Sequence, residues 1–163
     1  MGLLAASLWL YFAATTGNCA TIETTVTGNS MQGILWNGQK ITVYTLGCGE
    51  PQRYDHLLFT SEETPNAVVK QIWGMPGDML RVDDGGKLYI DDVMAKTPFG
   101  RPYVLIGFSK KRLKKLEGKP LEGFILLGHP GGLDSARVGQ VMSKSVLGYV
   151  KCNQPYAGDD PKG

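Results

Sequence analysis

The sequence predicts a mainly β protein built on an antiparallel sheet. Three observations lead to this prediction: short runs in which apolar and polar residues alternate, many turn-forming residues, and a strong hairpin signal near the middle of the chain. Of the 163 residues, 22 are glycine and nine are proline, which fits a turn-rich sheet better than a bundle of helices. The length is sufficient for one domain with its own core.

Turn residues separate the expected strands. Asp83-Asp84-Gly85-Gly86 gives the hairpin signal, and the turn Met75-Pro76-Gly77 ends the strand before it. Only the basic stretch at residues 110–115 (KKRLKK) breaks the β pattern within the domain. In chain order, strands are expected at residues 40–45, 55–59, 67–73, 79–82, 87–90, 93–95, 124–127 and 146–150.

The N-terminal region is apolar and uncharged over residues 3–14 (LLAASLWLYFAA). This length is typical of a signal-sequence core, whereas a membrane span needs about 20 residues. Counting the neighbours through Ile22 approaches that length, so we interpret residues 1–22 as a membrane anchor or signal-like segment, with a buried helix as the alternative. The first basic residue is Lys40, so the usual positive start is missing, which fits a start codon upstream. We expect the folded domain over residues 23–157 and a disordered tail over 158–163.

Charge and cysteine content exclude several classes of function. The 17 basic and 15 acidic residues nearly cancel, so no nucleic-acid partner is expected. The three cysteines Cys19, Cys48 and Cys152 lack metal-ligand spacing, and we expect neither a metal nor a cofactor. An odd count leaves at least one cysteine outside any intramolecular pair. A disulfide between Cys48 and Cys152 is permitted, although the sequence does not fix the pairing.

The basic stretch at residues 110–115 has two interpretations. It can contact anionic lipid headgroups or an acidic substrate tail, or it can be the solvated face of a helix or loop. The second interpretation is the simpler one, because such runs are usually solvated and the chain is nearly neutral.

Two stretches offer a nucleophile and a base. Ser30 follows Gly28 and Asn29, which tolerate the backbone angles of a tight turn. Lys70 lies inside an apolar strand (VVKQIWG), an unusual place for a charge. A serine hydroxyl needs a base to take its proton, and a lysine is such a base only if burial lowers its pKa. Taken singly, the two residues are more simply a turn serine and a surface lysine.

At these residues the sequence resembles the type I signal peptidase family of serine peptidases. The stretch GNSMQGIL matches the box around the family's nucleophile, and VVKQIWGMPGD matches the box around its general-base lysine. Leu126-Leu127-Gly128 followed by Asp134-Ser135 resembles the late box of the family. The three boxes occur in the family's order, and together they extend over most of the chain.

The resemblance implies roles for five residues. Neutral Lys70 would take the proton of Ser30, as in other serine–lysine dyads. The backbone N–H of Ser30 would hold the oxyanion, with Gly28 and Met31 beside it and a second donor that the sequence does not identify. Asp134 is expected to orient or tune Lys70; its alternative role is a turn aspartate that caps backbone amides.

Several positions depart from the family pattern. Gln32-Gly33 replaces the usual proline after Ser-Met, and Tyr54 stands where glycine is usual. The family serine that hydrogen-bonds the lysine falls at Gly132. We interpret His129 as a loop histidine without a catalytic role, and His56 lies in an expected strand.

The short insert between the lysine box and the late box resembles the plasmid conjugative-transfer branch, whose members mature pilin precursors and can cyclise them. We therefore expect a serine endopeptidase anchored in the inner membrane, with its catalytic domain on the periplasmic side. The expected partners are a pilin or another exported precursor and membrane lipid. The alternatives are a general secretory signal peptidase and a non-catalytic pilus-assembly protein that retains the fold.

Overall fold

A computed structural model describes residues 18–152, which form two antiparallel sheets. The larger sheet has six strands in the order β1-β2-β9-β3-β4-β8, and the smaller has the order β5-β6-β7. The prediction of a mainly antiparallel β protein is confirmed. The strands are β1 (Thr21–Thr25), β2 (Lys40–Tyr44), β3 (His56–Ser61), β4 (Thr64–Gly74), β5 (Leu80–Val82), β6 (Leu88–Ile90), β7 (Val93–Met94), β8 (Ile125–Leu127) and β9 (Val146–Val150).

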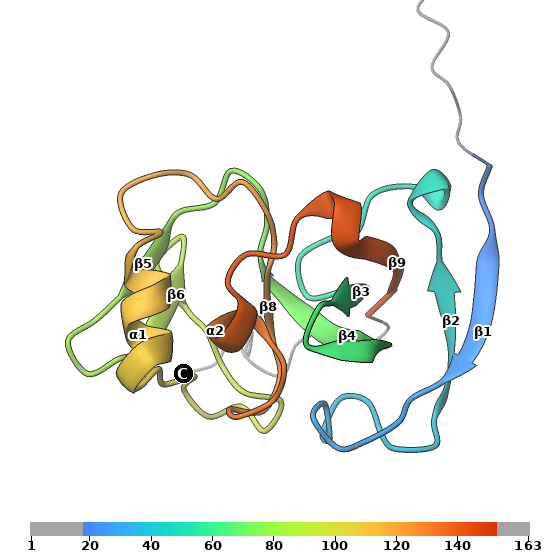
Figure 1. Ribbon diagram of the computed structural model, residues 1–163, viewed down its shortest axis with the longest axis horizontal. Coiled ribbons are helices and arrows are strands. Elements are labelled where there is room, and N and C mark those ends of the chain that lie inside the picture. Colours follow the sequence, from blue (N-terminus) through green and yellow to red (C-terminus); the bar gives the residue numbers. More distant parts are fainter. Residues whose placement is uncertain (1–17, 153–163) are drawn as a thin grey trace, which may run out of the picture.

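The two sheets lie at different ends of the molecule (Figure 1). Strands β1 and β2 are at one end of the long axis, and β5, β6 and helix α1 (Gly107–Lys114) are at the other. The basic stretch at residues 110–115 falls largely in α1. The remaining helical elements are short: α2 (Ser135–Val138) and the 3-10 turns η1 (Leu46–Cys48) and η2 (Ser143–Ser145).

Strand β1 was not expected from the sequence. It pairs antiparallel with β2, with Thr21 opposite Tyr44 and Thr25 opposite Lys40. None of its side chains is buried, so the alternation of apolar and polar residues that reveals a half-buried strand is absent. Because Thr21 and Ile22 belong to this strand, the folded domain begins before residue 23. The apolar run at residues 3–14 and the tail at 158–163 lie outside the described residues.

The hydrophobic core consists of three clusters. Neighbouring residues of a strand point to opposite faces, so Leu57 packs on one face of the large sheet and Leu58 on the other. The cluster with Leu57 also holds Ile72 and Leu126, and the cluster beside Leu58 lies against the β1–β2 side of the sheet. The third cluster joins the small sheet to α1 through Trp73, Leu80, Val82, Leu88, Ile90, Ala95, Tyr103, Leu105, Leu113, Leu121, Ile125 and Leu127.

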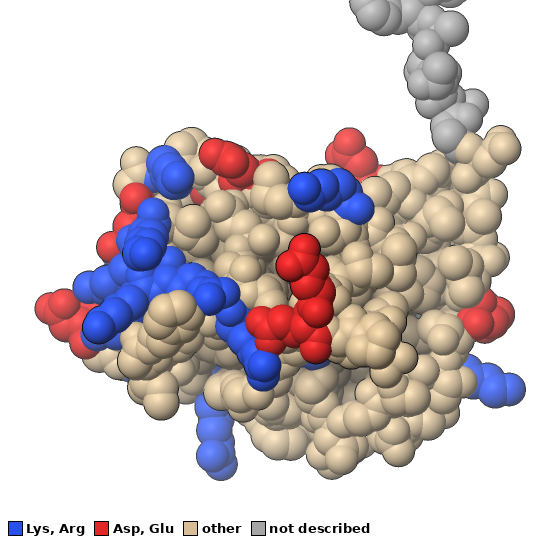
Figure 2. Space-filling view, viewed as in Figure 1, with Lys and Arg blue, Asp and Glu red and all other residues tan. Residues whose placement is uncertain are grey.

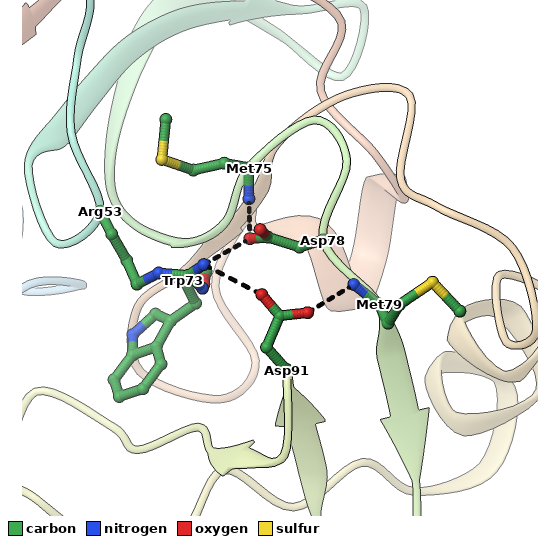
Figure 3. A network of polar contacts seen from close by, with 6 residues as sticks. All are labelled: Arg53, Trp73, Met75, Asp78, Met79 and Asp91. Atoms are coloured by element: carbon green, nitrogen blue, oxygen red, sulfur yellow. Dashed lines mark hydrogen bonds and ion pairs between the residues drawn. The ribbon is translucent and has the colours of Figure 1, made fainter.

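A polar network fixes the turn that follows β4 (Figure 3). The Arg53 guanidinium donates to the carbonyl oxygen of Trp73 at 2.9 Å and pairs with Asp78 at 2.9 Å and with Asp91 at 3.3 Å. The carboxylate of Asp78 also accepts the backbone N–H of Met75 at 2.6 Å. The Met-Pro-Gly-Asp turn is thereby tied to the loop before β3, and this holds the end of β4 in place.

The disulfide joins Cys19 to Cys48, not Cys48 to Cys152. The antiparallel pairing of β1 with β2 accounts for this disulfide, which the sequence left open, because it places the residues just before β1 beside those just after β2. The Cα atoms of Cys19 and Cys48 are 4.2 Å apart, and Cys152 lies outside this disulfide.

Candidate active site

Ser30 lies in the connection between β1 and β2. Gly28 adopts a φ of 86°, a conformation that favours glycine, and its backbone N–H donates to Asn37 Oδ1 at 2.9 Å. The Gly28 N–H is therefore engaged within the turn and is not directed at a substrate. The next side chain after Ser30, Met31, is only 1% exposed and anchors the turn in the core. Ser30 itself is half-buried.

Lys70 reaches Ser30 from the middle of β4. Its side chain is 2% exposed, and its Nζ donates to Ser30 Oγ at 2.6 Å and to the carbonyl oxygen of Val69 at 3.0 Å. None of the ion pairs within 4.0 Å in residues 18–152 includes Lys70. The lysine is thus buried without a carboxylate partner in direct contact.

Two glycines surround the aliphatic stem of Lys70. A Cβ atom at Gly128 would lie 2.6 Å from the Ser30 carbonyl oxygen and 2.8 Å from Lys70 Cδ, so no larger residue fits there without displacing the pair. A Cβ atom at Gly132, where the family has a serine, would lie 3.6 Å from Ser30 Cβ and 3.9 Å from Lys70 Cε. Gly132 therefore does face the pair, but it offers no hydroxyl.

Asp134 is buried at the start of α2, where it accepts three hydrogen bonds. Its Oδ1 accepts the backbone N–H of Ala136 at 3.0 Å; its Oδ2 accepts the Tyr103 hydroxyl at 2.6 Å and the backbone N–H of Gly128 at 3.3 Å. The capping role that the sequence left open is thus present in the structure. Asp134 acts on Lys70 only through its charge, because the two side chains form no direct ion pair.

Burial decides the protonation of these groups. It lowers the pKa of Lys70 from 10.5 to about 8, and the charge of Asp134 opposes this shift. Burial also raises the pKa of Asp134, against the hydrogen bonds from Tyr103, Gly128 and Ala136 and the charge of Lys70. The pKa of Tyr103 is raised by burial and by Asp134, so its hydroxyl stays protonated and remains a donor. Neutral Lys70, a form that can accept a proton, is therefore accessible near pH 8.

His129 supports the turn that carries Ser30, a role for which the sequence has no local signal. Its backbone N–H donates to the Ser30 carbonyl oxygen at 2.9 Å, and its ring Nε2 lies 2.8 Å from the carbonyl oxygen of Gln32. A carbonyl only accepts, so Nε2 carries the hydrogen. The ring also packs against Phe99, with centroids 4.4 Å apart. His129 positions the backbone of the turn and makes no hydrogen bond to Ser30 Oγ.

The other histidine does not reach Ser30. His56 in β3 is 2% exposed, and neither ring nitrogen has a hydrogen-bond partner among the described residues. Burial lowers its pKa to about 4, so it is neutral. Neither histidine of the chain therefore forms a serine–histidine pair with Ser30 in this structure.

A groove of about 620 Å³ opens beside Ser30 and Lys70. One wall is the end of β1 with the residues after it (24–27), and the other is the β4 segment 66–70. Strand β8 pairs with β4 only from Gln71 onward, so within the described residues one edge of the 66–70 segment carries no neighbouring strand. An extended peptide can pair with such an edge by backbone hydrogen bonds.

An antiparallel β domain that holds a serine hydroxyl against a buried lysine is, in chemical terms, suited to acyl transfer through a serine nucleophile. The sequence profile of the family described as "Signal peptidase, peptidase S26" matches residues 3–153. Because this match covers almost the whole chain, the protein belongs to that family.

The chain is also similar to individual proteins named signal peptidase I. Signal peptidase I from two strains of Streptococcus pneumoniae, TIGR4 and R6, is 30% identical over 98 residues, which is 60% of this chain and 47% of each relative. The chain thus spans about half the length of the curated relatives it matches. A crystal structure of a signal peptidase I from Enterococcus faecalis V583 aligns with a TM-score of 0.46 and 23% identity, covering 63% of this chain and 98% of that one.

Proposed function

We propose that this protein is a membrane-associated serine endopeptidase that removes leader peptides from exported precursors. In this proposal Ser30 is the nucleophile and Lys70 is its general base. The observation that carries it is the 2.6 Å contact between Lys70 Nζ and Ser30 Oγ. Membership of the signal peptidase family supports the class of substrate.

The proposed mechanism needs Lys70 in its neutral form. As Ser30 Oγ attacks the scissile carbonyl, Lys70 takes the hydroxyl proton, and the resulting ammonium gives it to the leaving amine. The backbone N–H of Ser30 is the proposed donor to the oxyanion. Water, or another amine, then attacks the acyl-enzyme and regenerates the Ser30 hydroxyl. The lowered pKa of Lys70, about 8, supports this role because an ammonium cannot accept a proton.

The substrate is proposed to lie extended in the groove beside the Ser30–Lys70 pair. Its backbone would pair with the open edge of the 66–70 segment, on the side that β8 leaves uncovered. This arrangement brings the scissile bond past Ser30 without any rearrangement of the sheet.

The proposed location is the outer side of the cytoplasmic membrane. The Cys19–Cys48 disulfide supports it, because disulfides persist in oxidising compartments and are rare in the cytosol. No helix within residues 18–152 has the length and apolar character needed to cross a bilayer. Membrane attachment is therefore proposed for the apolar sequence at residues 3–14, which lies outside the described residues.

Maturation of a conjugative pilin is the finer proposal, and it rests on the resemblance of the short insert to the conjugative-transfer branch. Ring closure needs the same acyl-enzyme, with the pilin's own terminal amine replacing water. General secretory processing is the second candidate, and the names of the Streptococcus pneumoniae relatives favour it.

The experiment compares cleavage of a pilin precursor and of a general exported precursor by the full chain in membranes. We expect Ser30→Ala to lose at least about 10³-fold in activity, as nucleophile removal does in other serine hydrolases. Ser143→Ala, which changes an exposed serine of η2, is the matched control and should keep full activity. Cleavage by Ser30→Ala at the wild-type rate would exclude the proposed nucleophile. Mass spectrometry separates a linear product from a cyclic one, which is lighter by one water.

A further inference from the structure

The outward side of α1 combines cations with large apolar side chains. Residues three and four positions apart lie on one side of a helix, so Lys111, Arg112 and Lys115, the last at the C-cap, share the side of Phe108. The Arg112 guanidinium lies 4.8 Å from the centroid of the Phe108 ring. The one buried residue of the helix, Leu113, is on the other side. We call Phe108, Lys111, Arg112 and Lys115 the α1 face; Ile106 is the extended N-cap residue that precedes the helix.

Phe108 of the α1 face and the neighbouring N-cap residue Ile106 are unusually exposed. Ile106 is 77% and Phe108 is 70% exposed, the highest values among the large hydrophobic residues that the structure describes. Val104 nearby is 38% exposed. Leaving two such side chains in water costs hydrophobic free energy that burial against a partner would recover.

The cations of the α1 face lack acidic partners. Helix α1 contains no aspartate or glutamate, and the ion pairs among residues 18–152 involve arginines outside this face. Arg112 donates to the Arg137 carbonyl oxygen, a neutral group. Lys and Arg side chains gather visibly over α1 in Figure 2. Basic residues at the end of a helix interact favourably with its dipole, but this does not account for the exposure of Ile106 and Phe108.

We propose that the α1 face binds the surface of an anionic lipid bilayer. Its cations would contact the headgroups, and Ile106 and Phe108 would enter the boundary between headgroups and acyl chains. An acidic polypeptide or a nucleic acid would neutralise the cations but leave much of the apolar surface in water. A bilayer interface accepts both kinds of side chain at once, and this decides between the partners.

The proposal does not depend on the chemistry at Ser30. Figure 1 places α1 at the opposite end of the long axis from β1, where the chain enters the domain. Contact through α1 would therefore add a second point of attachment and hold the long axis of the domain along the bilayer.

The test uses the full chain and vesicles of phosphatidylcholine, with or without phosphatidylglycerol. The measured quantity is the ratio of the binding constants for the two vesicles, in which the contribution of other apolar segments largely cancels. Each exposed lysine near an anionic surface contributes about fivefold. The double variant Lys111→Gln/Lys115→Gln should therefore lower the ratio by about 25-fold, whereas Lys144→Gln, an exposed lysine of η2, should change it by less than about twofold.

A second measurement reports on insertion. Phe108→Trp should show a blue-shifted emission and quenching by brominated lipids in anionic vesicles, relative to the wild-type background. Phe108→Ser should weaken binding to the same vesicles about tenfold, since a buried aromatic side chain is lost. An unchanged ratio for the double lysine variant, or a tryptophan at position 108 that stays in water, would overturn the proposal. Circular dichroism verifies that the variants are folded.

Discussion

The cation of the Arg53 cluster and the cation of the Ser30–Lys70 site lie in opposite surroundings. Arg53 is partly exposed and pairs with Asp78 and Asp91, both within 3.3 Å. Lys70 is buried, and its direct partners are a serine hydroxyl and a backbone carbonyl. A cation paired with carboxylates stays charged and braces the chain, whereas a buried cation without such a pair is easily deprotonated. The difference separates a structural cluster from a reactive one.

The pKa values of Asp134, near Lys70, and of Asp91, beside Arg53, are shifted in opposite directions. Burial raises the pKa of Asp134, although three hydrogen bonds oppose this. The pKa of Asp91 is lowered, first by the backbone N–H of Met79 and also by the charge of Arg53. One residue type therefore shifts in opposite directions, and the amount of surrounding water decides which contribution is larger.

The largest effect on activity is expected when Lys70 of the Ser30–Lys70 site is replaced. Lys70→Arg should lose at least about 10³-fold in cleavage activity, because a guanidinium stays protonated at any working pH. The measurement is precursor cleavage in detergent, with circular dichroism as the folding control. Comparable cleavage by the wild type and Lys70→Arg would show that Lys70 is not the base.

Lys70→Met extends this test to stability. The pKa of Lys70 is lower in the folded state than in the unfolded state, so protonation of Lys70 favours unfolding. The contribution of Lys70 to the free energy of unfolding therefore rises as the pH increases from about 8 toward 10.5. Below pH 8 the buried Lys70 is protonated, and its charge lowers the free energy of unfolding by an amount on the order of 3 kcal/mol. Lys70→Met removes it and should be inactive yet have a higher Tm at pH 7.

A smaller effect is expected in the structural cluster. Asp78→Ala removes a carboxylate that accepts the Met75 N–H and pairs with Arg53, and should lower the free energy of unfolding by about 2 kcal/mol. Activity per folded molecule should change little. Urea unfolding measures the effect, with the exposed Asp84→Ala as the control, expected within about 0.5 kcal/mol of wild type. Equal destabilisation by both variants would contradict the bracing role.

The smallest effect concerns the influence of Asp134 on Lys70. The charge of Asp134 raises the pKa of Lys70, so Asp134→Asn should move the alkaline rise in activity to below pH 8, by about one unit or less. Tyr103→Phe removes a hydrogen bond to Asp134 but keeps its charge, and should leave the position of the rise unchanged. A pH–rate profile that Asp134→Asn does not move would leave Asp134 with its capping role only.

The sheet could be expected from the sequence because it leaves local signals, whereas the pairing of Ser30 with Lys70 was implied by the resemblance of their two boxes to the signal peptidase family. Alternating residues indicate the half-buried strand β2, and a lysine in an apolar strand is conspicuous. The structure places that lysine 2.6 Å from the serine.

The supporting residues leave no such signal. Tyr103 and Asp134 are 31 residues apart, and their contact depends on how α2 packs beside the irregular segment after β7. His129 supports the turn through its backbone N–H, which every residue type except proline carries, and through a ring hydrogen bond to Gln32, 97 residues away in the sequence. Strand β1 has no buried side chain, so it is recognisable only by its pairing with β2. A local sequence pattern does not reveal packing between distant residues or hydrogen bonds made by the backbone.

The disulfide between Cys19 and Cys48 has a mechanical consequence. Among the strands of residues 18–152, β1 is at the edge of the sheet and pairs only with β2. A pull on the chain ahead of Cys19 would otherwise peel β1 from β2 one residue pair at a time, starting at Thr21. The covalent link carries the tension past β1 directly into η1 and the end of β2. The turn that holds Ser30, at the far end of the β1–β2 pair, is thereby shielded from forces applied to the N-terminal side.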